Sequence, residues 1–176
     1  MCKTKQYIET HIKNVRKKIQ TFSSILYKRG ELHDRSKLEY PEYQEWCKMD
    51  EEPKYPYGSK EYERKKQKYK YLFDYHYAHN RHHPDRWKDY IFPFCPDLLD
   101  LIEMLCDWIA YKDSISYKEA KEIIKQQSIR FKFSEELSDI LLNTLYNYYV
   151  CIGKANELKN EAPKIVKNYH HVDILT

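Results

Sequence analysis

The sequence contains few of the residues that form tight turns, disulfides or membrane spans. Only three of its 176 residues are glycine, so glycine-turn hairpins have little support and helices are favoured. Its five cysteines are odd in number and never form a CxxC pair, which argues against a disulfide framework and a thiolate zinc site. No stretch approaches the roughly 18 apolar residues of a membrane-spanning helix. We therefore expect a helical, cytoplasmic protein that is neither secreted nor inserted in a membrane.

Charges of both signs are interleaved along the chain. Thirty-one lysines and arginines are offset by twenty-seven acids, which leaves a formal net charge of +4. This excess could attract a small phosphorylated ligand, but it is too small and dispersed to be typical of a nucleic-acid-binding protein.

The spacing of apolar residues predicts an all-α bundle of about five to seven helices. The first helix is expected over 4–29, because apolar residues recur there at steps of four and three and Gly30 supplies a natural stop. Further helices are expected over 59–80, 97–110 and 116–127, and from Ser134 onward. A long loop rich in proline and tyrosine is expected over 39–58, with at most a short helix over 42–48. We expect one domain over 1–152 and a peripheral tail over 153–176.

Histidines and acids are arranged in an order that suggests a metal site, because imidazoles and carboxylates are preferred ligands of borderline divalent metals. His11 lies at the border of the apolar stripe of the first helix, where a core histidine is the simpler interpretation. His33 and Asp34 are adjacent, so they can meet one ion only where the backbone bends or where both flank it. Four histidines then occur within eight positions, namely His76, His79, His82 and His83.

Three acids lie on one stripe of the most apolar predicted helix, at Asp100, Glu103 and Asp107. A buried ionised carboxylate must be paired, protonated or bound to a metal. Ion pairs with lysine or arginine are the structural alternative to a metal site. Tyrosines at 55–57 and 69–77 could stack a base, although tyrosines at helical spacing also suit a core.

Four segments carry a resemblance to a known family. They are HDRSK at 33–37, YGS at 57–59, NRHHP at 80–84 and DLIEMLCDW at 100–108. Over roughly residues 8–147 they resemble small phage and bacterial proteins grouped as domain of unknown function family 5662. The order His11, His33-Asp34, later histidines and Asp107 also resembles the H...HD...H...H...D pattern of the HD superfamily of metal-dependent phosphohydrolases.

The HD resemblance implies a site with one or two divalent ions of Mn, Fe, Co, Ni or Zn. It implies a first ion held by His11, His33, Asp34 and Asp107. A second ion, bridged by Asp34, would be held by His76 and one of His82 and His83. Asp34, Lys37 and Glu103 would act in catalysis, with Glu103 or Asp100 orienting water or anchoring a ligand histidine. Substrate contacts would come from Arg35, Lys37, Asn80 and Arg81.

The main hypothesis is an HD-type phosphohydrolase or phosphodiesterase that acts on a nucleotide or a cyclic (oligo)nucleotide. For a phage-type protein this activity would lie in the host cytoplasm. One alternative is an HD-fold di-iron oxygenase, and another is a non-catalytic helical interaction protein with a structural metal. A homo-oligomer is compatible with each of these hypotheses.

Overall fold

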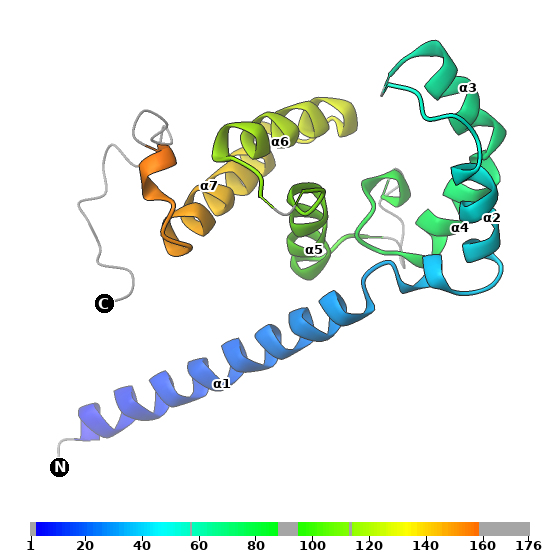
Figure 1. The fold of residues 1–176 in the computed structure, drawn as a ribbon. Helices are drawn as coiled ribbons and strands as arrows, with labels where there is room; N and C mark the ends of the chain where they lie inside the picture. Colours follow the sequence, from blue (N-terminus) through cyan, green and yellow to red (C-terminus); the bar gives the residue numbers. More distant parts are fainter. Residues whose placement is uncertain (1–2, 57, 88–94, 113, 159–176) are drawn as a thin grey trace. The chain divides into compact units, whose positions relative to one another are not determined.

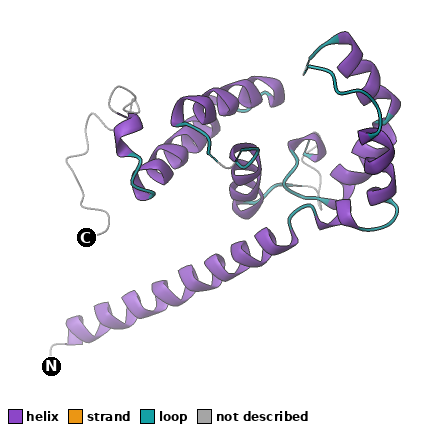
Figure 2. Cartoon of the chain, viewed as in Figure 1, coloured by secondary structure: helices purple, strands orange, loops and turns teal. Residues whose placement is uncertain are grey.

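The computed structural model describes residues 3–56, 58–87, 95–112 and 114–158, and these ranges consist of helices joined by loops and turns (Figure 1). No strand occurs among the described residues (Figure 2), which confirms the predicted all-α class. The elements are α1 (Lys3–Leu32), η1 (Arg35–Leu38), α2 (Glu42–Asp50), α3 (Lys60–Lys68), α4 (Lys70–His79), η2 (Pro84–Arg86), α5 (Leu98–Ile109), α6 (Tyr117–Phe131), α7 (Glu135–Cys151) and η3 (Ala155–Leu158).

The chain divides into two compact units, 1–103 and 104–176, with the division inside α5. The first unit contains α1 to α4 and the start of α5, and the second contains the rest of α5 with α6, α7 and η3. The predicted tail over 153–176 lies outside the described residues from 159 onward. Its described part includes Leu158, which is buried.

Helix α1 differs from the prediction in its end and in its burial. It continues through Gly30 to Leu32, so the predicted stop at Gly30 is wrong. None of its described residues is buried, and the apolar residues Ile12 and Phe22 are more than half exposed. Its 30 residues make α1 about 45 Å long, and its apolar stripe is largely exposed over this length.

The helix predicted over 59–80 is two helices that meet at Tyr69. Ser59 caps α3 as predicted, since its side chain accepts a hydrogen bond from the amide of Tyr62 at 3.1 Å. Tyr69 leaves helical geometry, is buried, and donates its hydroxyl to Glu52 Oε1 at 2.7 Å. Helix α4 then buries Leu72 and His76, which places a histidine inside the first unit.

The second unit is built on α6 and α7, whose starts match the predicted serine caps. Ser116 and Glu119 form a reciprocal capping box, and Ser134 accepts from the amide of Leu137 at 3.2 Å. The buried residues of this pair are Tyr117, Ala120, Ile124, Ser128, Leu141, Leu145 and Tyr149. Among the described residues, no helix is long and apolar enough to cross a membrane.

We predict that Ser116→Ala lowers the free energy of unfolding by about 1 kcal/mol, because the α6 amide of Glu119 loses its capping oxygen. Urea unfolding followed by circular dichroism measures the change. Ser116→Asn is the matched control, and it should change the free energy by only about a few tenths of a kcal/mol, since asparagine supplies a capping oxygen of its own. Equal losses in the two variants would contradict a capping role.

Candidate metal centre

The chain bends sharply where α1 ends, and this bend brings His33 and Asp34 to one place. Asp34 adopts a left-handed conformation, with φ 52° and ψ 19°, which aspartate tolerates better than most residues. The turn is closed by the amide of Lys37, which donates to the carbonyl of Asp34 at 2.9 Å. As a result, His33 Nε2 lies 3.7 Å from Asp34 Oδ2, so the two adjacent side chains face the same point.

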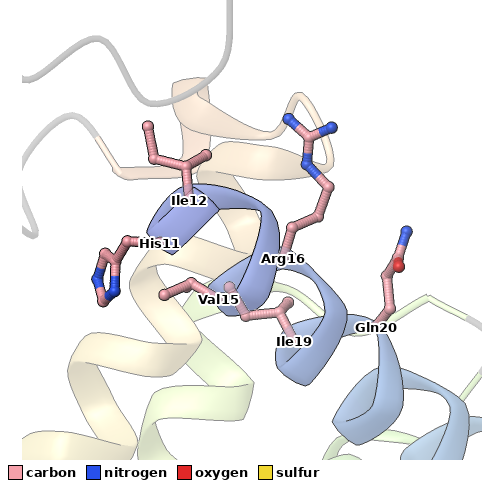
Figure 3. A pocket seen from close by; sticks show the side chains of 6 residues that line it. All are labelled: His11, Ile12, Val15, Arg16, Ile19 and Gln20. Atoms are coloured by element: carbon pink, nitrogen blue, oxygen red, sulfur yellow. The ribbon is translucent and has the colours of Figure 1, made fainter. Parts of the chain in front are cut away.

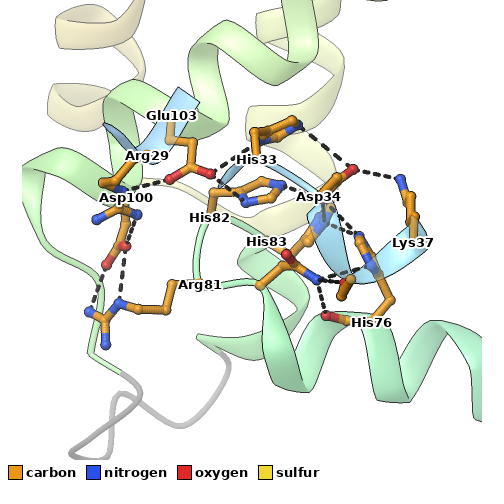
Figure 4. Close-up of polar contacts among 12 residues, drawn as sticks. Arg29, His33, Asp34, Lys37, His76, Arg81, His82, His83, Asp100 and Glu103 are labelled. Atoms are coloured by element: carbon orange, nitrogen blue, oxygen red, sulfur yellow. Dashed lines mark hydrogen bonds and ion pairs between the residues drawn. The ribbon is translucent and has the colours of Figure 1, made fainter. Parts of the chain in front are cut away.

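Three further imidazoles converge on the other carboxylate oxygen of Asp34 (Figure 4). The Nε2 atoms of His76, His82 and His83 lie 3.2, 3.5 and 3.8 Å from Asp34 Oδ1. This oxygen is buried, and it accepts no hydrogen bond from any residue that the structure describes. Leaving a buried carboxylate oxygen without a partner is costly. A cation among these nitrogens would remove that cost.

Two groups of candidate ligands share Asp34. In the first group, one ligand atom from each of Asp34, His33 and His82 lies within 4.8 Å of the others. The same holds for Asp34, His76 and His83. The sequence left open which of His82 and His83 belongs to the site, and the structure brings one of them to each group.

Glu42, which the sequence analysis did not single out, anchors the second group. It begins α2 and is 1% exposed. Its Oε1 lies 2.5 Å from His76 Nδ1 and also accepts from the indole of Trp46 at 2.8 Å. An imidazole that donates Nδ1–H to a carboxylate presents the Nε2 lone pair to a metal. When His76 donates Nδ1–H to Glu42, its Nε2, which lies 2.8 Å from His83 Nε2, has the form suited to coordination.

Glu103 anchors the first group in the same way. Its Oε1 lies 3.0 Å from His33 Nδ1 and 3.1 Å from His82 Nδ1. Both histidines can donate to this oxygen, which leaves their Nε2 atoms directed at Asp34. This geometry fits the predicted option that Glu103 anchors a ligand histidine.

Two arginines hold the acids of α5 in place. Arg29 donates Nε to Glu103 Oε2 at 2.6 Å and a terminal nitrogen to Asp100 Oδ1 at 2.5 Å. Arg81 donates to both oxygens of Asp100, at 3.2 and 2.8 Å. Asp100 also accepts from the amide of Asp97 at 2.9 Å. Ion pairing, the structural alternative for these acids, therefore accounts for Asp100.

The site favours the ionised forms of Asp34 and Glu103 and the neutral form of His83. Burial alone would raise the pKa of Asp34, but contacts with His76, His83 and Lys37 hold it well below its usual range. Burial likewise opposes ionisation of Glu103, and its imidazole and arginine partners bring its pKa far below the ordinary value. Burial lowers the pKa of His83. These are the protonation states that metal ligands require.

Comparison with known proteins supports the resemblance carried by the sequence motifs. Residues 2–147 match a family described as "Family of unknown function (DUF5662)". The chain belongs to this family. No curated protein and no solved structure matches the chain. Membership in DUF5662 thus confirms the closest resemblance, and it brings no established activity with it.

His11 of this DUF5662 protein does not join the cluster, so its predicted role as a ligand is wrong. It lies on α1, about 30 Å before the end of that unbroken helix. There it lines a hollow on the helix surface with Ile12, Val15 and other α1 residues (Figure 3). Because the cluster begins after α1 ends, no rearrangement short of breaking the helix would bring His11 to Asp34.

Asp107 lies on α5, one helical turn after Glu103 and on the same side of that helix. It belongs to the second unit, whereas Glu103 ends the first. The regular helix is thus consistent with the predicted alignment of the two acids. Asp107 remains a predicted ligand.

The four residues that were predicted to contact the substrate lie in different environments. Lys37 donates to Asp34 Oδ2 at 2.6 Å and is partly exposed at the edge of the site. Arg35 is exposed and pairs with Glu39 at 3.3 Å. Asn80 donates to Ser36 Oγ at 2.9 Å, and Arg81 is engaged by Asp100. Lys37 therefore has the most suitable position for a substrate contact, while Asn80 and Arg81 hold the fold of the site.

We predict that Asp100→Asn lowers the free energy of unfolding at neutral pH by about 3 kcal/mol, because it removes the buried counter-charge of Arg81 and one of the two that pair with Arg29. Asp97→Asn is the control, since Asp97 is 53% exposed and its contacts with the same arginines are 3.9 and 3.7 Å long. It should change the free energy by less than about 1 kcal/mol.

The acid dependence of stability provides a second test of this ion pair. Contacts with Arg81 and Arg29 outweigh burial and lower the pKa of Asp100 below 3.8. Its contribution is therefore complete above that pH and is lost as the pH falls through the lowered value. The difference between wild type and Asp100→Asn should shrink in acid. A constant difference from pH 7 to pH 2 would contradict the assignment.

Proposed function

We propose that this protein is a metal-dependent phosphohydrolase related to the HD superfamily. The observation that carries the proposal is the buried Oδ1 of Asp34, which accepts no hydrogen bond from the described residues although three imidazole nitrogens face it. A cation bound at this oxygen would compensate the cost of burying it. Nitrogen and oxygen donors without thiolate suit Mn, Fe, Co, Ni or Zn.

The donor set fits two ions with Asp34 between them. His33 and His82 would hold the first, with Asp107 as a further candidate, and His76 and His83 would hold the second. Ions bound in such a site lower the pKa of a water molecule toward neutrality and stabilise charge on phosphoryl oxygens.

Residues of the chain would orient the metal ligands and balance the charge of the phosphate during phosphate-ester hydrolysis. Glu42 and Glu103 fix the orientation of three imidazoles through their Nδ1 atoms. Lys37 is partly exposed beside Asp34, so its ammonium group can turn to a phosphate oxygen and balance its charge. The proposed substrate is a nucleotide or a cyclic (oligo)nucleotide, and a phage protein of this kind would act in the host cytoplasm.

We expect the purified wild-type protein, reconstituted with Mn²⁺ or Zn²⁺, to retain one or two ions and to hydrolyse bis(4-nitrophenyl) phosphate. Asp34→Ala should lose the ions and the activity, because Asp34 contributes to both groups. Plasma mass spectrometry measures metal content, and the absorbance of released 4-nitrophenolate measures hydrolysis. Circular dichroism checks that the variant is folded.

His79→Ala is the matched histidine control for the metal measurement. His79 is one of the four closely spaced histidines in the sequence, but its ring contacts the carbonyl of Tyr75 and stacks on the Tyr75 ring. The control should keep both metal and activity. A wild-type protein that takes up no metal at neutral pH would overturn the proposal. Turnover that requires iron and oxygen would favour the di-iron oxygenase instead.

The two anchoring glutamates should affect different ions. We predict that Glu103→Gln weakens one metal-binding step by about 10- to 100-fold, and that Glu42→Gln weakens the other by a similar factor. The reason is that Glu103 contacts His33 and His82, whereas Glu42 contacts His76. Calorimetric titration of the metal-free protein with Zn²⁺ separates the two steps. Weakening of the same step by both substitutions would contradict two distinct groups.

A further inference from the structure

A second hollow in the first unit combines aromatic walls with lysines. It has a volume of about 280 Å³ and lies between the end of α2, the following loop, α3 and α4. Its apolar lining comes from Met49, Tyr55, Tyr62 and Phe73. Unlike Tyr69, which is buried in the core, Tyr55 is 39% exposed. The tyrosines of this hollow therefore do not belong to the core, which was the structural alternative for them.

Side-chain contacts fix the loop that carries Tyr55. Lys65 donates to the backbone carbonyls of Glu52 and Pro53, at 3.1 Å each. The side chain of Glu52 accepts from the buried hydroxyl of Tyr69. The loop is thus attached to α3 and to the start of α4 just before Tyr55, so the hollow is formed before any ligand arrives.

The charges around the hollow favour an anion. Lys54, Lys65 and Lys66 line it together with one acid, Asp50. Lys54 is more than four-fifths exposed and forms a surface contact with Asp50 at 3.3 Å, which is a weak interaction. Lys66 Nζ lies 5.9 Å from the centre of the Phe73 ring. A ligand that places a ring against the aromatic wall would therefore have its charged group beside an ammonium.

Trp46 connects this hollow to the candidate metal centre. Its ring packs edge-on against Phe73 at 5.4 Å and against His76 at 6.0 Å. Phe73 and His76 are also one turn apart on α4. The hollow and the centre therefore lie on the same pair of helices, with Trp46 between them.

We infer that the hollow is a binding site for the base of a phosphorylated nucleoside, with the ring against Tyr55, Tyr62 and Phe73 and the phosphate beside Lys66. Aromatic side chains bind bases through their π-faces with little selectivity, and lysine supplies a point charge for phosphate. The choice of a nucleotide as ligand rests on the proposed function. The inference adds the hollow, besides the metal centre, as a second region where the substrate contacts the protein.

The test is calorimetric binding of AMP, adenosine and ribose 5-phosphate to the full chain in the presence of a chelator. AMP should bind, whereas adenosine and ribose 5-phosphate should each bind at least 10-fold more weakly. Tyr55→Ala should weaken AMP binding by roughly 5- to 100-fold, as expected for loss of one stacking partner. Tyr62→Leu, which keeps the bulk of the side chain, is a second variant in case the first alters the loop.

Lys66→Gln should weaken AMP binding and leave adenosine binding unchanged, because only AMP carries the phosphate. Tyr43→Ala is the control, since Tyr43 is exposed on α2 and does not line the hollow. No AMP binding at millimolar concentration, or AMP binding that survives both tyrosine substitutions, would overturn the inference. The chelator removes metals, so this result is independent of the metal content and hydrolysis that test the proposed function.

Discussion

The burial of one oxygen of the Asp34 carboxylate, Oδ1, is the constraint on which the site depends. A carboxylate taken out of water needs compensating charge or hydrogen bonds, and Lys37 supplies them to Oδ2. For Oδ1 the surroundings are imidazole nitrogens at 3.2 Å and beyond. The left-handed backbone of Asp34 makes this possible, because it directs the carboxylate into the cluster immediately after a long helix ends. The histidines around Asp34 Oδ1 are placed where they could hold a cation that compensates this buried oxygen.

The two anchoring glutamates show how distant segments build one centre. Glu42 comes from the start of α2 and Glu103 from α5, yet each contacts the Nδ1 atoms of histidines whose Nε2 atoms face Asp34. Arg29 supports Glu103 from the last turn of α1. Glu103 is held at both oxygens, by two histidines at Oε1 and by Arg29 at Oε2, whereas Glu42 is held by a histidine and an indole at Oε1. Contacts of this kind, made to the ring nitrogen that does not face the metal, orient the histidine ligands.

Much of the helical framework could be predicted from the sequence, because it depends on local signals such as the serine caps of α3, α6 and α7. The density of histidines also indicated the cluster around Asp34. His11 was misplaced because periodicity defines the face of a helix but not which part of its length is near the site. Glu42 was missed because nothing local distinguishes it from exposed neighbours such as Glu39 and Tyr43. Its role arises from contact with His76, 34 positions away.

The same burial links metal binding to the stability of the first unit. Without an ion, Asp34 Oδ1 lowers the stability of the folded state, since water would solvate this oxygen in the unfolded chain. An ion that binds the folded form alone removes this penalty and adds stability that grows with the logarithm of its concentration. The histidines must also be neutral to bind it, and burial already lowers the pKa of His83. The proposed centre is therefore part of the fold as well as a site for chemistry, and its two roles are separable only when stability and activity are measured on the same variants.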